Sequence, residues 1–249
     1  MKMKHLGVSS SDQLYKDKFL ILDPINRAIE QNKIDGINIA PYGLDIWNAY
    51  EFSFLDSNKK PCLKILEIKI PSNSPNTIES KSLKLYLNSF YDQSFKSDKH
   101  VIDTIKKDLE KICECLISID FINEFEKNPI SISILSKDLK TIEPNDTCHF
   151  EGFRSICPVT GQPDWATIYI NADIPIDTDW LINFLISFRN IGEFHELCID
   201  KIYSKLNTQY NPNKLTVYGR FLRRGGIDIN PLRSSSKNFK FKNHREFNQ

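Results

Sequence analysis

The sequence predicts an α+β protein in which antiparallel sheets carry helices on one face. Short segments that alternate β-branched or aromatic residues with polar ones indicate strands. Each group of such segments is followed by apolar residues at the spacing of an amphipathic helix. The same order of segments occurs twice in the 249 residues, of which 40% are hydrophobic, so the chain can bury a substantial core.

The first half is predicted to form a hairpin followed by two helices. Residues 45–70 alternate around the polar turn 56–60, which favours two antiparallel strands. Residues 78–90 have apolar side chains at positions i, i+3, i+4 and i+7, the spacing of one buried helical face. These side chains are Leu83, Tyr86, Leu87 and Phe90. A second helix is predicted within residues 99–116.

The second half repeats this plan. Strands are predicted at residues 130–135, 148–156 and 165–174. A helix over residues 175–188 follows, and either Asp177 or Thr178 is expected to cap its first turn. Its apolar positions each lie 98 residues after their counterparts in the first half, and they are Leu181, Phe184, Leu185 and Phe188. We therefore expect an internal repeat.

The repeat predicts two modules, residues 1–125 and 126–233, followed by a polar basic tail at residues 234–249. Because the tail has little apolar periodicity, we expect it to be disordered or loosely packed on a neighbour. Neither module alone is expected to be complete.

Composition excludes several classes of function. Lysine plus arginine number 33 against 32 acidic residues, so no overall field favours nucleic acid or membrane. Any partner must therefore be recognised by a local site. No apolar run resembles a signal peptide or membrane span, which predicts a cytoplasmic protein. The six cysteines are too sparse for a disulfide scaffold, and their spacing matches no zinc ribbon or finger, so no metal is expected.

Cys157 and Asp164 are the candidate catalytic residues. Cys157 lies in the segment RSICPVTGQPDWATI between two predicted strands, where Pro158, Gly161 and Pro163 favour a tight loop. A loop that folds back brings the thiol and the carboxylate to one small site, as nucleophile and proton donor. Such a pair in isolation is more often a buried thiol and a turn former.

Two further regions suggest binding. His195 and Glu196 flank the buried face of a predicted helix, and a carboxylate there can accept two parallel N–H bonds from a guanine-like edge. Glu79, Ser80 and Lys81 begin the first-half helix, whose first turn offers free N–H groups to an anion. Each pattern is also common on ordinary helix surfaces. The segment RRGG at 223–226 is a plausible clamp for phosphate groups.

Four segments in this order along the chain are hard to obtain by chance: ESKSLKLYLNSF at 79–90, SICPVTGQPDWA at 155–166, SFRNIGEFHE at 187–196 and RRGGIDINP at 223–231. Together they resemble the NADPH-dependent 7-cyano-7-deazaguanine reductases, the nitrile reductases of queuosine biosynthesis. ESK lies in the first half and FHE in the second, as in the two-module form of that family. The resemblance implies a tandem tunnelling fold (T-fold), in which sheets backed by helices assemble into barrels with sites at module or subunit junctions. We also expect a homodimer.

The resemblance also implies roles for individual residues. Cys157 would attack the nitrile carbon to form a covalent thioimide, and Asp164 would give a proton to the nitrogen. The substrate would be held by Ile78, Glu79, Ser80, His195 and Glu196. NADPH would be held by Ser80, Lys81, Arg224 and Gly225.

Two alternatives stay open at this point. The first is a zinc hydrolase on the same fold, similar to a GTP cyclohydrolase, with Cys157, His195 and Cys198 as ligands. The second is a non-catalytic purine- or pterin-binding protein. The ESK element has no task in metal hydrolysis, and the presence of both Cys157 and Asp164 argues against lost catalysis.

Overall fold

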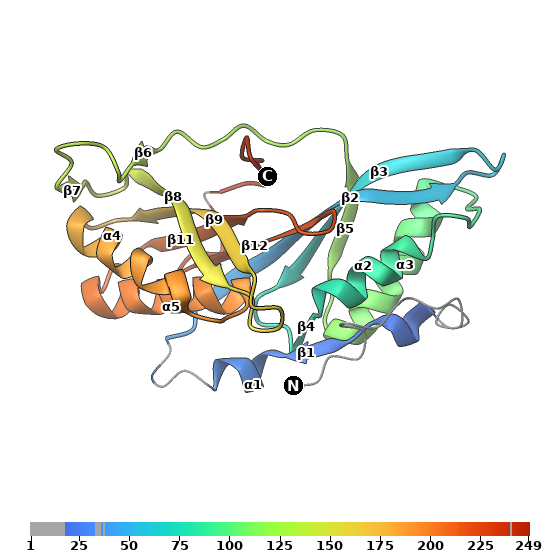
Figure 1. Cartoon of the computed structure of the whole chain (residues 1–249), viewed down its shortest axis with the longest axis horizontal. Coiled ribbons are helices and arrows are strands. Elements are labelled where there is room, and N and C mark those ends of the chain that lie inside the picture. The colour runs from blue at the N-terminus through green and yellow to red at the C-terminus, as the bar shows by residue number, and fades with distance from the viewer. Residues whose placement is uncertain (1–17, 33–35, 37, 240) are drawn as a thin grey trace. The chain divides into compact units, whose positions relative to one another are not determined.

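The computed structural model describes residues 18–32, 36, 38–239 and 241–249 (Figure 1). They form a mixed α+β structure with largely antiparallel strands and helices on one face. The described chain divides into two compact units, here called the first and second unit. The first unit contains residues 18–30, 47–124 and 224–227, and the second contains residues 31–32, 36, 38–46, 125–223, 228–239 and 241–249. No helix in the described part of the chain is long and apolar enough to cross a membrane.

The first unit is built on the predicted hairpin. Its strands are β2 (Tyr42–Leu55), of which the first five residues belong to the second unit, β3 (Pro61–Pro71) and β5 (Ser118–Ile122). The turn between β2 and β3 closes because the Asp56 carboxylate accepts N–H bonds from Asn58 and Lys60 at 2.8 and 2.9 Å. Strand β5 pairs antiparallel with β3. A short pair joins β1 (Pro24–Asn26) to β4 (Asn76–Ile78), near the short helices η2 (Lys18–Ile21) and α1 (Arg27–Gln31).

Two helices cover the first unit, α2 (Ser80–Asn88) and α3 (Asp98–Cys113), and they lie side by side in Figure 1. The predicted apolar face of α2 is confirmed, because its four apolar positions are at most 3% exposed. Phe90 packs against Phe52, and Phe52 stacks on Phe121 of β5, with ring centroids 5.8 Å apart in both pairs. An aromatic core therefore joins helix to sheet.

The second unit repeats the order of the first. Its main strands are β8 (Thr147–Ile156), β9 (Pro163–Ala172), β11 (Leu215–Phe221) and β12 (Ile227–Ser234). They form consecutive antiparallel neighbours, and the two-residue β6 (Ile132–Ser133) pairs parallel with β8. The helices α4 (Thr178–Ile186) and α5 (His195–Tyr210) pack on one face, with η3 (Ser187–Asn190) between them. A further short pair joins β7 (Thr141–Ile142) to β10 (Ile176–Asp177).

The internal repeat extends to the ends of the helices. Glu79 caps α2 and Asp177 caps α4, with nearly the same backbone angles (φ −69° and ψ 127°, against φ −66° and ψ 123°). Asp177, one of the two predicted caps, accepts the N–H of Trp180 at 2.7 Å. Helices α3 and α5 each have 16 residues and each end at a left-handed residue, Glu114 and Asn211. The two copies thus share capping as well as apolar spacing.

The tail differs from the prediction. Residues 241–249 pack within the second unit, where Phe241, His244 and Gln249 are at most 5% exposed. His244 lies edge-on to Tyr169 and Tyr218, with ring centroids 5.0 and 5.6 Å away. The prediction of a disordered or loosely packed tail was wrong, because hydrogen bonds and ring contacts of polar side chains hold this segment without any apolar periodicity.

Candidate active site

The loop between β8 and β9 holds Cys157 at its first position. Strand pairing ends at Ile156 opposite Pro163. The N–H of Cys157 then donates to the carbonyl of Gln162 at 2.8 Å, and its carbonyl accepts the N–H of Gly161 at 3.0 Å. Gly161 has φ +69°, a conformation that favours glycine. The half-buried thiol therefore sits on a closed, backbone-bonded loop, as the sequence predicts.

The segment before α5 lies along the edge of β8 beside this loop. The N–H of Ile156 donates to the carbonyl of Ile191 at 2.9 Å, and the carbonyl of Ile156 accepts the N–H of Glu193 at 3.0 Å. Between them, Gly192 lies so close to the loop that an added Cβ would be 3.9 Å from the Cα of Pro158. This pairing brings the start of α5 next to the cysteine loop.

Asp164 and His195 form a buried pair. His195 Nε2 lies 3.2 Å from Asp164 Oδ1, and their side chains are 12% and 5% exposed. In the strand register Asp164 faces Ser155, two residues before the cysteine. The imidazole stacks on Phe221 with ring centroids 3.9 Å apart and planes 6° from parallel. A carboxyl and an imidazole so placed can share and pass on one proton.

Further polar groups are buried around this pair. Within the described residues, His195 Nδ1 is buried without a hydrogen-bond partner, and the Ser155 hydroxyl faces the Cys198 thiol. Glu196, in the first turn of α5, is only 8% exposed, so it is not an ordinary surface carboxylate. Cys198 follows on the same helix and is fully buried, and burial raises the pKa of its thiol well above the usual range.

In the first unit, the start of α2 departs from one expectation. Both oxygens of the Glu79 carboxylate cap the helix, accepting the N–H of Lys81 at 2.9 Å and that of Ser82 at 2.7 Å. The prediction that these N–H groups are free for an anion was wrong, because the cap takes them. Ile78 is buried. Ser80 is exposed and Lys81 is half-buried, so the side chains of these two residues remain accessible to a ligand.

Arg224 and Gly225 lie on a tight turn of the same unit. Arg224 and Ile227 exchange two backbone hydrogen bonds of 2.8 and 3.2 Å across Gly225 and Gly226, whose φ angles are +58° and +81°. Positive φ at both central residues is the pattern of a type I′ turn. A Cβ on Gly225 would lie 2.6 Å from Lys84 Nζ, so the end of this lysine side chain lies directly against the turn.

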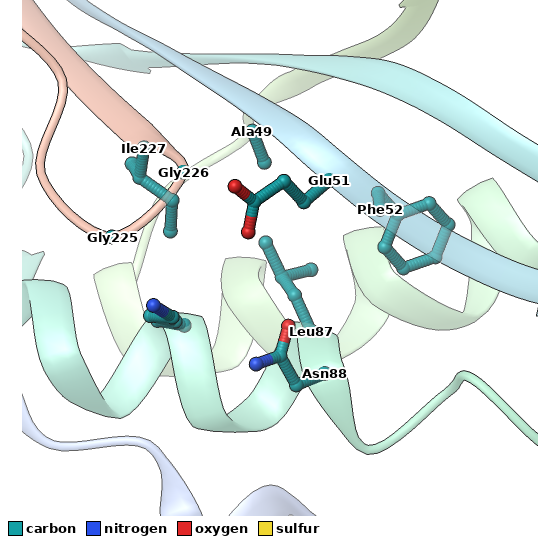
Figure 2. A pocket seen from close by; sticks show the side chains of 9 residues that line it. Ala49, Glu51, Phe52, Leu87, Asn88, Gly225, Gly226 and Ile227 are labelled. Atoms are coloured by element: carbon teal, nitrogen blue, oxygen red, sulfur yellow. The ribbon is translucent and has the colours of Figure 1, made fainter.

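A small open pocket lies beneath this turn. Figure 2 shows the Glu51 carboxylate turned toward Gly226, and Asn88 on the helix below. The pocket combines the turn, polar groups and apolar walls, with lining residues Ala49, Glu51, Phe52, Lys84, Leu87, Asn88, Gly225, Gly226 and Ile227. It offers an ammonium group, a carboxylate and bare backbone to a polar ligand.

Comparison with known proteins identifies the family. A family model described as "Nitrile reductase, 7-cyano-7-deazaguanine-reductase N-term" matches residues 12–121, and one described as "QueF-like protein" matches residues 163–240. The NADPH-dependent 7-cyano-7-deazaguanine reductase of Coxiella burnetii (strain Dugway 5J108-111) is 37% identical over 253 residues, covering 92% of this chain and 91% of the relative. The chain belongs to the NADPH-dependent 7-cyano-7-deazaguanine reductase family.

Other relatives in this reductase family match at similar length. The reductase of Burkholderia ambifaria (strain MC40-6) is 38% identical over 239 residues, covering 86% of this chain and 87% of the relative. That of Bordetella avium (strain 197N) is 39% identical over 239 residues, covering 87% of this chain and 88% of the relative. The resemblance inferred from the four motifs is thereby confirmed.

The structure gathers the predicted site residues of this reductase family member into two groups. In the second unit the loop of Cys157, the pair Asp164 and His195, and Glu196 belong to one end of the β8–β9 hairpin and the start of α5. In the first unit Ile78, Glu79, Ser80 and Lys81 begin α2, and Arg224 and Gly225 form the turn. Sequence reasoning missed Phe221, which contacts His195 but belongs to no motif.

Proposed function

We propose that this chain reduces the nitrile of 7-cyano-7-deazaguanine to the aminomethyl group of 7-aminomethyl-7-deazaguanine, with NADPH as reductant, in the biosynthesis of tRNA queuosine. Membership of the reductase family over most of the chain supports this reaction. The observation that carries it is a thiol on a closed loop beside a buried carboxyl–imidazole pair. Nucleophile and proton source are what addition to a nitrile requires.

The first step is covalent. The Cys157 sulfur, as thiolate, forms a bond to the nitrile carbon, one C–N π bond opens, and the nitrogen takes a proton from Asp164 to give a thioimide. His195 Nε2, 3.2 Å from Asp164, is placed to return a proton to that carboxylate. The carbon takes two hydrides, which NADPH would supply. After the first, the C–S bond breaks, the Cys157 sulfur leaves as thiolate and an imine forms; the second hydride and a proton convert this imine to the amine. Asp164 and His195 therefore hold and deliver the protons that accompany these steps.

The carboxylates of Glu196 and Glu79 would bind the deazaguanine base of the substrate. A deazaguanine presents a ring N–H and an exocyclic amine side by side, and one carboxylate can accept both. Glu196 is buried and lies one residue from His195, which suits this role. Each Glu79 oxygen accepts one backbone N–H of α2, and a carboxylate oxygen has a second lone pair for a ligand. The backbone near Ile78 and Ser80 would complete the contact.

The first unit has residues that fit NADPH. The positive-φ turn at Gly225 lets a phosphate approach the backbone, and Lys84 Nζ lies beside it. The exposed Ser80 hydroxyl and the Lys81 ammonium group lie at the start of α2, and Arg224 adds a guanidinium fork. These side chains, and not the capped N–H groups of α2, would hold the phosphates.

The same proposal includes tandem T-fold modules at residues 1–125 and 126–233 and a homodimer. The shared caps and the shared helix lengths of α3 and α5 support duplication of one module. Sedimentation velocity measures the mass of the assembly in solution, and a monomer would contradict the dimer.

The nucleophile is tested by mass spectrometry of the intact protein mixed with substrate but no NADPH. The wild type should gain the mass of one substrate, and Cys157→Ala should gain none and should not oxidise NADPH. Cys62→Ala is the matched control, since its thiol is also half-buried. An adduct on Cys157→Ala, or normal turnover by it, would contradict the mechanism.

The zinc alternative is weakened by the environment of its proposed ligands. Cys198 is completely buried with a raised thiol pKa, whereas a zinc ligand must be a thiolate. His195 Nε2 is already directed at Asp164. Stoichiometric zinc in the purified protein, needed for activity, would overturn the thioimide mechanism.

A further inference from the structure

Phe221 determines how the His195 ring lies. It is fully buried at the end of β11, and its ring is stacked on the imidazole at a centroid distance of 3.9 Å. A parallel stack this close leaves the imidazole little freedom to tilt. The direction of Nε2 toward Asp164 therefore depends on where the backbone of Phe221 is held.

That backbone is held by side-chain amides on the side of β12. The pairing of β11 with β12 runs from Thr216 to Tyr218, three residues short of Phe221. At Phe221 the N–H donates to Asn230 Oδ1 at 3.1 Å, and the carbonyl accepts from Gln249 Nε2 at 2.7 Å. Two amide groups thus take the place of a strand neighbour.

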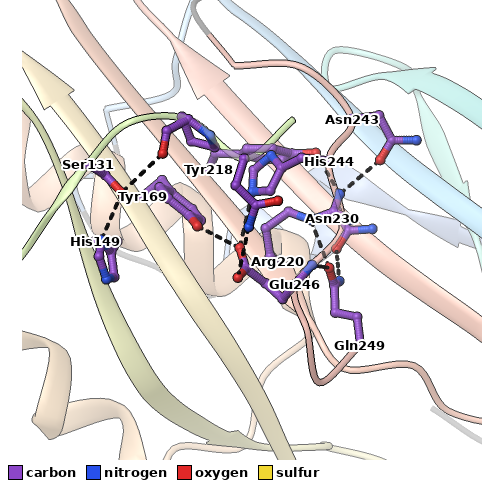
Figure 3. A network of polar contacts seen from close by, with 12 residues as sticks. Ser131, His149, Tyr169, Tyr218, Arg220, Asn230, Asn243, His244, Glu246 and Gln249 are labelled. Carbon is purple, nitrogen blue, oxygen red and sulfur yellow. Dashed lines mark hydrogen bonds and ion pairs between the residues drawn. The ribbon is translucent and has the colours of Figure 1, made fainter. Parts of the chain in front are cut away.

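The Gln249 amide uses its full hydrogen-bonding capacity. Its Oε1 accepts from Arg220 Nε at 3.1 Å and from the N–H of Glu246 at 3.0 Å. Its Nε2 donates to Asn230 Oδ1 at 3.0 Å (Figure 3). The same nitrogen donates to the carbonyl of Phe221. A primary amide has two acceptor and two donor positions, and here all four are filled at 3% exposure.

We propose that Gln249 is a positioning residue for proton delivery: through the carbonyl of Phe221 it fixes the ring on which His195 stacks, and so aligns Nε2 with Asp164. The inference rests on the proposed function, in which this pair carries the proton. A buried polar group that is satisfied on every side specifies one arrangement, because any displacement leaves a donor or acceptor unpaired.

Two substitutions test the proposal. Gln249→Ala removes the amide, and Gln249→Glu keeps its shape and its acceptor but removes both N–H donors. Phe247→Ala is the control, because this side chain lies in the same segment and is fully exposed. Each variant is assayed for kcat and KM from about pH 5.5 to 9, and the His195 ring signals are titrated by NMR in the free protein.

Both Gln249 variants should lower kcat by about tenfold or more while KM for the substrate changes by less than about threefold. The pH profile of kcat should shift, and the His195 ring signals, which the stacked Phe221 moves upfield, should change position and titration midpoint. Phe247→Ala should match the wild type in every measurement.

A different pattern overturns the proposal. If the His195 signals and the pH profile of both Gln249 variants match the wild type, and only thermal stability falls, Gln249 is a structural residue. Should Gln249→Ala fold poorly, the near-isosteric Gln249→Glu and the same NMR titration decide. If the wild type does not reduce the nitrile, the proposed function fails, whereas the NMR comparison still tests the coupling of Gln249 to His195.

Discussion

Replacing Asp200 by asparagine should destabilise the second unit strongly. Asp200 lies on α5, the helix that begins at His195, and forms an ion pair with the Nε of Arg233 on β12. Arg233 Nη1 also lies 2.8 Å from Asp45 Oδ1. The three side chains are 4%, 1% and 0% exposed, in the order Asp200, Arg233 and Asp45. They therefore form a buried charged triad that ties α5 to the sheet.

The size of the effect follows from this burial. Burial alone would lower the pKa of Arg233, but Asp200 and Asp45 raise it above its usual value, so the guanidinium stays charged. Asp200→Asn leaves Arg233 paired with Asp45 but removes one of its two buried charge-assisted hydrogen bonds, at a cost of about 1.5–3 kcal/mol. At a urea m-value of about 3 kcal/mol/M, the unfolding midpoint should fall by about 0.5 to 1 M.

Urea unfolding of wild type, Asp200→Asn and a control measures this difference. Asp179→Asn is the control. The Asp179 side chain is 70% exposed, and its ion pair with Lys140 should contribute less than about 1 kcal/mol to the free energy of unfolding. Hydrogen exchange should show the lost protection in α5. A loss for Asp200→Asn no larger than for Asp179→Asn would refute the reasoning that the buried triad anchors this helix.

Three other changes give separate tests. Glu196→Ala should raise KM for the nitrile substrate more than KM for NADPH, and equal increases would make Glu196 structural. Gly225→Ala should raise KM for NADPH by about tenfold with little change in KM for the substrate, because a Cβ is strained at φ +58° and would push the Lys84 ammonium group away from the turn. An unchanged KM for NADPH would remove the turn from the cofactor site. Burial alone would raise the pKa of Glu246, but hydrogen bonds from His244 and Tyr169 outweigh it and lower the pKa below 4.5. The ionised carboxylate therefore stabilises the fold above that pH, and this contribution is lost as the pH falls through the lowered pKa. Glu246→Gln should make the free energy of unfolding, measured by urea titration, depend less steeply on pH in acid. An unaltered dependence on pH would contradict this.

The elements that the sequence predicts are those fixed by local rules. The apolar spacing of Leu83 and Leu181 and the turn at Asp56 predict helices and hairpin directly. The cap at Asp177 follows from its position before an apolar run. The tight loop at Cys157 follows from its prolines and glycine. Each signal lies within a few residues of its structure.

The remaining features depend on contacts between distant residues. His195 and Asp164 are 31 positions apart, and no spacing rule indicates that the imidazole faces the carboxylate. Gln249 and Phe221 are separated by 28 positions and meet through an amide and a carbonyl. Polar contacts of this kind have no period, so the ordered segment at 241–249 and the role of Phe221 are visible only in three dimensions.

The first turns of α2 and α4 carry side chains of opposite charge. Position 81 of the first copy is a lysine, and its counterpart 98 residues later is Asp179, although the backbone around both caps is nearly superimposable in its angles. If the start of α2 binds the phosphate groups of NADPH as proposed, the carboxylate of Asp179 would repel them from the start of α4. The chain should therefore bind one equivalent of NADPH, and calorimetric titration should saturate at a single nucleotide per polypeptide.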